Sequence, residues 1–198
     1  MRPVSIIIKK SVLLILLSTF TGTAFASNPG QKLYMGIGIS QTKLQTNEQN
    51  IRAISGVTSE STLQNSETGY TVYMGINLDQ YLSIEMGYID FGNYSVQTST
   101  QKNKLFSANS LHITSALNYP ITDSLNIYAK AGFSSWRTLS TDILFETDGT
   151  GLVYGAGLDI NLYNGNHRTL QLEWLHQEFD NITLSNSDSI TASLVFSF

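Results

Sequence analysis

Four charged residues lie inside segments in which apolar and polar residues alternate: Glu85, Lys130, Asp159 and Glu173. Because successive side chains of a strand point to opposite faces, all four share the face opposite the bulky apolar residues. A charge on an enclosed face has to be paired or hydrogen-bonded. We therefore expect a polar cluster in which Lys130 is the cation shared by the carboxylates. Packing and ion conduction are both open as roles, and the need for pairing favours packing.

The histidines do not form a catalytic pattern. His112, His167 and His176 are spread along the chain, and no cysteine is present. Acyl-transfer chemistry needs a nucleophile beside a base, and His176-Gln177-Glu178 offers no hydroxyl or thiol nucleophile. Three scattered histidines do not match the ligand spacing of a metal site either. We expect no enzymatic activity, no metal and no cofactor.

Composition excludes further classes. The chain has 11 Lys and Arg against 15 Asp and Glu, a formal net charge of −4. Nucleic-acid binding relies on clustered Lys and Arg, so we expect no nucleic-acid partner. After the first 26 residues no uncharged apolar stretch approaches the roughly 20 residues of a membrane helix.

The alternation recurs in eight separate segments with the strand period of two. They begin near Leu33, Tyr70, Leu82, Leu111, Leu125, Leu152, Leu170 and Ile190. Three connections are short and rich in turn residues: 79–80, 121–124 and 164–166. The other four are longer and polar: 46–66, 95–107, 138–150 and 181–188. Short turns at one end and long outer loops at the other are typical of outer-membrane barrels. The sequence therefore predicts an all-β fold, an eight-stranded antiparallel up-and-down transmembrane β-barrel.

A soluble β-sandwich is the alternative fold, because its strands also alternate. The face opposite the apolar residues decides against it, since glycines recur there among scattered polar groups: Gly36, Gly38, Gly75, Gly87, Gly132, Gly155 and Gly157. Small residues suit the crowded interior of an eight-stranded barrel. The bulky apolar residues would then face lipid.

The first 26 residues have the layout of a cleaved secretory signal. Basic residues Arg2, Lys9 and Lys10 precede a short apolar run, and the segment ends in Ala24-Phe25-Ala26. We predict a signal peptide over 1–26 and a mature barrel domain over 27–198. Retention of the segment as an N-terminal anchor is the alternative.

Several segments resemble the OmpA-like transmembrane domain family. The stretch 118–132, NYPITDSLNIYAKAG, followed by Trp136-Arg137, carries most of the resemblance. Glu85-Met86-Gly87-Tyr88 and the stretch 34–38 are also similar to it. The resemblance implies the outer membrane of a Gram-negative bacterium, with lipid and lipopolysaccharide as surroundings. It also implies assembly by periplasmic chaperones and the barrel-assembly machinery, which reads a terminal residue similar to Phe198.

The resemblance implies a function through the outer loops. Larger family members continue into a periplasmic peptidoglycan-binding domain, whereas this sequence ends at the barrel, so we do not expect cell-wall tethering by that route. Stand-alone small barrels include adhesins and colonisation factors, which favours a surface protein whose loops contact host or cell-surface components and which contributes to envelope integrity. A narrow ion channel or a purely structural component is the alternative. Glu85 and Asp159 match acidic lumen positions of the family, but its basic positions fall on Ala116 and Thr169, so a matching ion gate is in doubt.

Overall fold

The computed structural model describes residues 32–46, 62–64, 66–97, 102–140, 147–162, 168–179 and 184–198. This part of the chain consists of β-strands joined by turns. The strands are β1 (Lys32–Thr46), β2 (Thr62–Gln64), β3 (Ser66–Asn77), β4 (Leu82–Gln97), β5 (Lys102–Thr122), β6 (Leu125–Ser140), β7 (Asp148–Asn161), β8 (Arg168–Glu178) and β9 (Leu184–Ser197).

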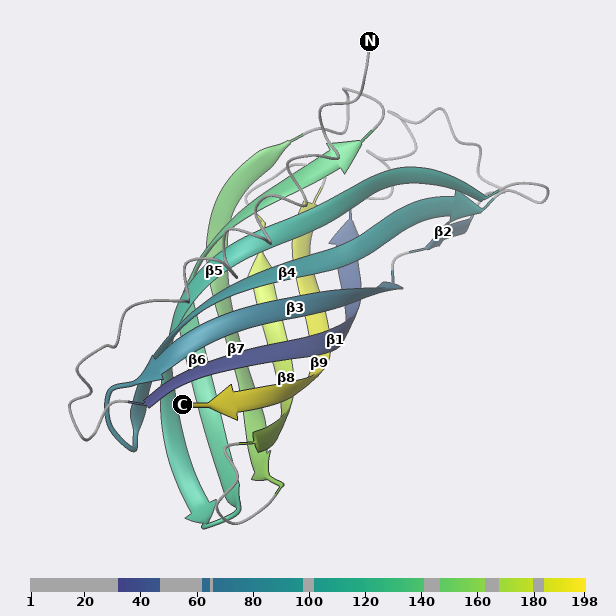
Figure 1. Cartoon of the computed structure of the whole chain (residues 1–198). Coiled ribbons are helices and arrows are strands. Elements are labelled where there is room, and N and C mark those ends of the chain that lie inside the picture. Colours follow the sequence, from purple (N-terminus) through teal and green to yellow (C-terminus); the bar gives the residue numbers. More distant parts are fainter. Residues whose placement is uncertain are drawn as a thin grey trace.

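Eight long strands form a closed antiparallel barrel. They are hydrogen-bonded in the order β4-β3-β1-β9-β8-β7-β6-β5, and β4 also pairs with β5 to close the ring. The short β2 pairs only with the end of β4, where Thr62 lies opposite Gln97. Figure 1 shows that the strands are strongly tilted relative to the barrel axis. Because closure pairs every long strand on both sides, no sheet edge is exposed to lipid. The predicted fold class is confirmed.

Two of the predicted short turns lie at one end of the barrel. Between β3 and β4, Asp79 Oδ1 accepts hydrogen bonds from the backbone N–H groups of Tyr81 and Leu82, at 2.6 and 2.8 Å. Between β5 and β6, Thr122 Oγ1 accepts from the backbone N–H groups of Ser124 and Leu125, at 3.2 and 3.0 Å. The third predicted turn, 164–166, lies outside the described residues.

The strands extend further into the long connections than the sequence predicts. The expected loop 95–107 is wrong in extent, because β4 continues to Gln97 and pairs there with Lys102, the first residue of β5. The expected loops 46–66, 138–150 and 181–188 are likewise shortened by β1, β2, β6, β7 and β9. The apolar alternation that marked the strands ends where the membrane ends, whereas backbone pairing does not depend on side-chain polarity.

Burial is inverted relative to a soluble protein. Ile39, Leu117 and Phe133 are each 68% exposed, whereas Lys130 is 5% and Thr191 3% exposed. A sandwich would bury its large apolar residues against one another. In this barrel those side chains point outward and polar ones point into the lumen, as in membrane barrels with lipid outside.

The outward apolar band has the height of a membrane. On β5 it runs from Leu111 to Ile121, which are both about half exposed. Ten residues rising about 3.3 Å each on a strand tilted by about 40° span about 25 Å, the height of the lipid-facing band of such barrels. Aromatic contacts mark its end near the long connections, between Tyr70 and Tyr88 and between Tyr154 and Trp174. In the described part of the chain, no helix is long and apolar enough to cross a membrane.

The inward glycines provide space for inward aromatic rings. Tyr73 lies opposite Gly36 on β1, and a Cβ added at Gly36 would overlap the Tyr73 phenol. The same relation joins Tyr34 with Gly75. Two further pairs, Tyr128 with Gly157 and Trp136 with Gly149, show it across β6 and β7. The small inner-face residues thus allow large rings to lie flat against the neighbouring strand, which is how aromatic residues cover glycines in sheets.

Candidate functional site in the barrel lumen

The centre of the lumen is crossed by two ion pairs. Lys130 Nζ on β6 lies 2.7 Å from Glu85 Oε1 on β4 and 2.7 Å from Glu173 Oε2 on β8. β4 and β8 are four strands apart in either direction around the ring, so the pairs bridge opposite walls. The Lys130 side chain is only 3% exposed. The structure therefore brings together three of the four charged residues singled out in the sequence.

Hydrogen bonds from phenols complete this ionic cluster of Glu85, Lys130 and Glu173. Tyr128 Oη donates to Glu173 Oε2 at 2.7 Å, and Tyr34 Oη donates to Glu85 Oε2 at 3.3 Å. His112 Nε2 lies 3.9 Å from Glu85 Oε1. Because two carboxylates share one lysine, these donors occupy lone pairs that would otherwise be buried without partners. Sequence reasoning missed both tyrosines, although Tyr128 shares the inner face of β6 with Lys130.

Asp159, the fourth residue, is held by amides. Its Oδ2 accepts a hydrogen bond from Asn126 Nδ2 at 3.1 Å and its Oδ1 accepts one from Gln171 Nε2 at 3.0 Å. Asn126 precedes Lys130 by four residues on β6, so Asp159 lies closer to the short turns than the ionic cluster does. The expectation that Lys130 would serve all three carboxylates therefore applies to Glu85 and Glu173, whereas amide donors serve Asp159.

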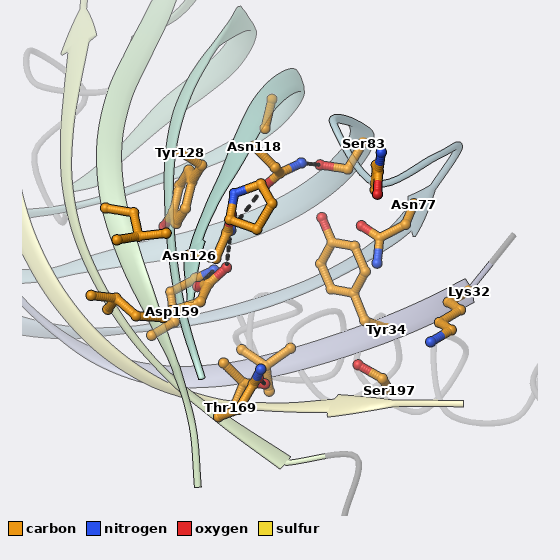
Figure 2. A pocket seen from close by; sticks show the side chains of 18 of the residues that line it. Lys32, Tyr34, Asn77, Ser83, Asn118, Asn126, Tyr128, Asp159, Thr169 and Ser197 are labelled. Carbon is orange, nitrogen blue, oxygen red and sulfur yellow. Dashed lines mark hydrogen bonds between the residues drawn. The ribbon is translucent and has the colours of Figure 1, made fainter. Parts of the chain in front are cut away.

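A polar cavity opens at the short-turn end of the barrel. Its volume is about 870 Å³, and it reaches from Lys32 and Asp123 near the mouth to Glu85 and Lys130 at its inner end. Figure 2 shows Asn118, Asn126 and Asp159 side by side along its wall. Short turns face the periplasm in outer-membrane barrels. We call this cavity the periplasmic vestibule.

Apolar side chains cluster at the other end of the lumen, beside buried polar ones such as Thr138 and Gln177, and we call this cluster the apolar plug. It consists of Leu44, Ile89, Phe91, Ala108, Trp136 and Phe179, none more than 6% exposed. The rings of Phe91 and Phe179 meet edge to face with centroids 6.0 Å apart, and those of Trp136 and Phe179 with centroids 5.1 Å apart. Phe91 belongs to β4 and Phe179 follows β8, so the contact spans the lumen. The expectation that aromatic groups face lipid is wrong for these residues.

The positions aligned with the family's basic residues hold no charge. Ala116 is buried and pairs with Lys130 across β5 and β6. Thr169 Oγ1 donates a hydrogen bond to Asn161 Oδ1 at 2.9 Å near the short-turn end. The lysine of this chain thus lies on the strand beside Ala116.

A hydrogen-bonded histidine–carboxylate pair lies on the outer surface, where sequence reasoning placed none. His176 Nδ1 is 2.8 Å from Asp188 Oδ1, across β8 and β9. Both side chains are on the outward face next to the aromatic residues at the end of the apolar band. The sequence does show polar residues at these outward positions. It does not show that His176 and Asp188 lie opposite each other, because that depends on the register between β8 and β9. No group of three potential metal ligands occurs in the described part of the chain.

Phe198 lies on the outward face beside the short-turn end. It is 69% exposed, and its backbone N–H donates to the Leu33 carbonyl at 2.8 Å. Its role as an assembly signal stays a prediction.

Comparison with known proteins agrees with this architecture. The family model of the OmpA-like transmembrane domain matches residues 29–198. Outer membrane protein A of Klebsiella aerogenes is 30% identical over 114 residues, covering 56% of this chain and 32% of that protein. The Klebsiella pneumoniae protein is 29% identical over 121 residues, covering 57% and 35%. This chain thus matches about a third of the length of these relatives.

Solved structures with low sequence identity share the fold. Neisserial surface protein A has a TM-score of 0.59 at 12% identity, covering 84% of this chain and 97% of that one. Ail of Yersinia pestis has a TM-score of 0.55 at 13% identity, covering 85% and 99%. OprG of Pseudomonas aeruginosa has a TM-score of 0.52 at 14% identity, covering 85% and 96%. With an inverted barrel surface and a family match over nearly the whole chain, the protein belongs to the OmpA-like transmembrane domain family of the Gram-negative outer membrane.

Proposed function

We propose that the barrel is a closed, non-conducting anchor that presents its long connections to partners outside the cell. The apolar plug carries this proposal. An ion crossing it would lose hydration against apolar side chains, and apolar constrictions block conduction by excluding water. With the lumen closed near the long connections, those connections are the part of the protein available to external partners.

The chemistry of the connections fits surface recognition. The sequence places Arg52 with several apolar residues in 46–66, Lys102 and Lys104 in 95–107, and acidic residues in 138–150. Rigid scaffolds commonly carry binding functions on such segments. Ail, which shares the fold, has been solved with the heparin analogue sucrose octasulfate. This supports adhesion to a host or matrix component, and we propose that the barrel also contributes to envelope integrity.

Deleting segments between strands tests the adhesion proposal. Deleting 48–61 or 141–146 removes no residue of a strand. We expect bacteria displaying either variant to bind cultured epithelial cells and immobilised heparin several-fold less than bacteria displaying the intact protein. Tyr81→Ala, at the short-turn end, is the matched control and should bind normally. If both deletion variants fold and bind as well as the intact protein, adhesion through these segments is wrong.

The runner-up function is a narrow pore, favoured by the vestibule that reaches the ionic cluster from the periplasmic end. Planar bilayers separate the two functions. We expect no steady current from the intact protein, because the apolar plug is closed. A steady single-channel current that Glu85→Gln or Lys130→Met abolishes would establish the pore instead.

A further inference from the structure

A row of polar and aromatic side chains crosses the outer face at the upper end of the apolar band. Tyr154, His176, Asp188 and Lys43 are directly paired across β7, β8, β9 and β1. The His176 ring stacks on Tyr154 with centroids 4.8 Å apart and an angle of 28°. Just below this row, Trp174 and Ile190 are exposed and apolar. The row therefore lies at the level where lipid tails give way to head groups.

The hydrogen bonds within the row determine which nitrogen of His176 can accept a hydrogen bond from a ligand. Asp188 Oδ1 pairs with His176 Nδ1, and its Oδ2 accepts a hydrogen bond from Gln45 Nε2 at 3.3 Å. A carboxylate accepts, so the proton of a neutral His176 ring is on Nδ1. Nε2 then carries a lone pair and acts as an acceptor.

A groove of about 590 Å³ adjoins this row. Its lining is amphiphilic: Phe133 and Leu152 are apolar, whereas Thr150, His176, Glu178 and Asn186 are polar. Asn186 Oδ1 is buried and accepts no hydrogen bond from the residues that the structure describes. The Asn186 amide, His176 Nε2 and the Glu178 carboxylate supply acceptors to the polar wall, beside the hydroxyls of Thr150 and Ser185.

A ligand that fits this groove has a head group with several hydrogen-bond donors, attached to an apolar tail. Hydroxyl groups donate to carboxylate, amide and imidazole acceptors, and aromatic residues such as Tyr154 and Trp174 combine an apolar face with a polar tip at membrane interfaces. We propose that the groove binds the sugar head group of an outer-leaflet glycolipid, with hydroxyls on His176, Glu178 and Asn186 and the lipid tail along Phe133 and Leu152. This lipid site lies on the outer face of β6 to β9, next to the outer connections, and it does not rest on the adhesion proposal.

Native mass spectrometry of the full, detergent-folded chain tests the site. The probes are monogalactosyldiacylglycerol, phosphatidylethanolamine and phosphatidylcholine with the same acyl chains, added in equal amounts. The galactolipid supplies hydroxyl donors, the ethanolamine lipid supplies an ammonium, and phosphatidylcholine has no donor. We expect the galactolipid to be retained several-fold more than either phospholipid.

Variants locate the binding. His176→Phe keeps the ring on Tyr154 but removes the nitrogen, and should lower galactolipid retention by about two- to tenfold, the worth of one hydrogen bond. Ser135→Ala, an exposed outward residue on β6, is the control and should retain it fully. Equal retention of the galactolipid and phosphatidylethanolamine would overturn the sugar assignment. Unchanged retention by folded His176→Phe and by Asn186→Leu would overturn the site.

Discussion

At the scale of single residues, the lumen shows how a membrane barrel tolerates buried charge. Lys130 is held by two carboxylates, and each carboxylate also accepts a phenol hydrogen bond. Breaking a buried ion pair from one side leaves an uncompensated charge, whereas removing all partners together leaves none. The energetic importance of Lys130 therefore depends on the presence of Glu85 and Glu173.

Lys130→Met should destabilise the folded barrel by about 3–5 kcal/mol, because it leaves two carboxylates without their cation. Urea unfolding in detergent, followed by tryptophan fluorescence, measures the change. The variant that also carries Glu85→Gln and Glu173→Gln should recover most of the loss, and Lys43→Met on the outer face should cost little. An unchanged unfolding midpoint for Lys130→Met would show that the pairing does not stabilise the barrel.

At the scale of strands, inward rings and glycines form cross-strand pairs. Tyr128 on β6 covers Gly157 on β7, and its hydroxyl reaches Glu173 on β8 only because the ring can lie over the glycine. The pairing thus links the backbone of one strand to the ionic cluster. It also explains why the inner face has both the smallest and some of the largest residues.

Gly157→Ala should destabilise the barrel by about 1–3 kcal/mol, the usual cost of overpacking. The added Cβ would overlap the Tyr128 hydroxyl and ring carbon as well as approach the Leu172 carbonyl. The midpoint of urea unfolding is again the measurement. Ala131→Val, on the exposed outer face of β6, has room for its methyl groups and serves as the control. Equal midpoints for Gly157→Ala and the intact chain would contradict the close packing.

At the scale of the whole molecule, the two ends of the barrel differ in chemistry. The periplasmic vestibule is open to water and ends at the ionic cluster, and the apolar plug lies in the lumen beyond it. The strands form one continuous hydrogen-bonded ring. Its outer face carries the apolar membrane band and its inner face lines the polar lumen. Such a ring cannot open strand by strand without exposing backbone to lipid.

Closure predicts heat-modifiable mobility on gels. Residues 27–198, folded in detergent, should remain a compact barrel in unheated sample buffer and migrate differently after boiling, because boiling breaks the ring of strand pairs. Circular dichroism should show β-sheet before boiling. A single band that is unaffected by heat, from protein that stays soluble in plain buffer, would contradict the membrane barrel.

The sequence by itself determined the period, the inner and outer faces and two short turns, because side-chain alternation and turn chemistry are local properties. It also identified Glu85, Lys130 and Glu173 as inward residues. The apolar plug, the amide partners of Asp159 and the His176–Asp188 pair were decided only by the tertiary structure. The apolar plug joins strands that are distant in the chain, and it depends on the curvature that brings opposite walls together. The other two sets of contacts join neighbouring strands and depend on the register of their pairing. Strand ends beyond the membrane were also missed, because backbone hydrogen bonds continue there without an apolar signal.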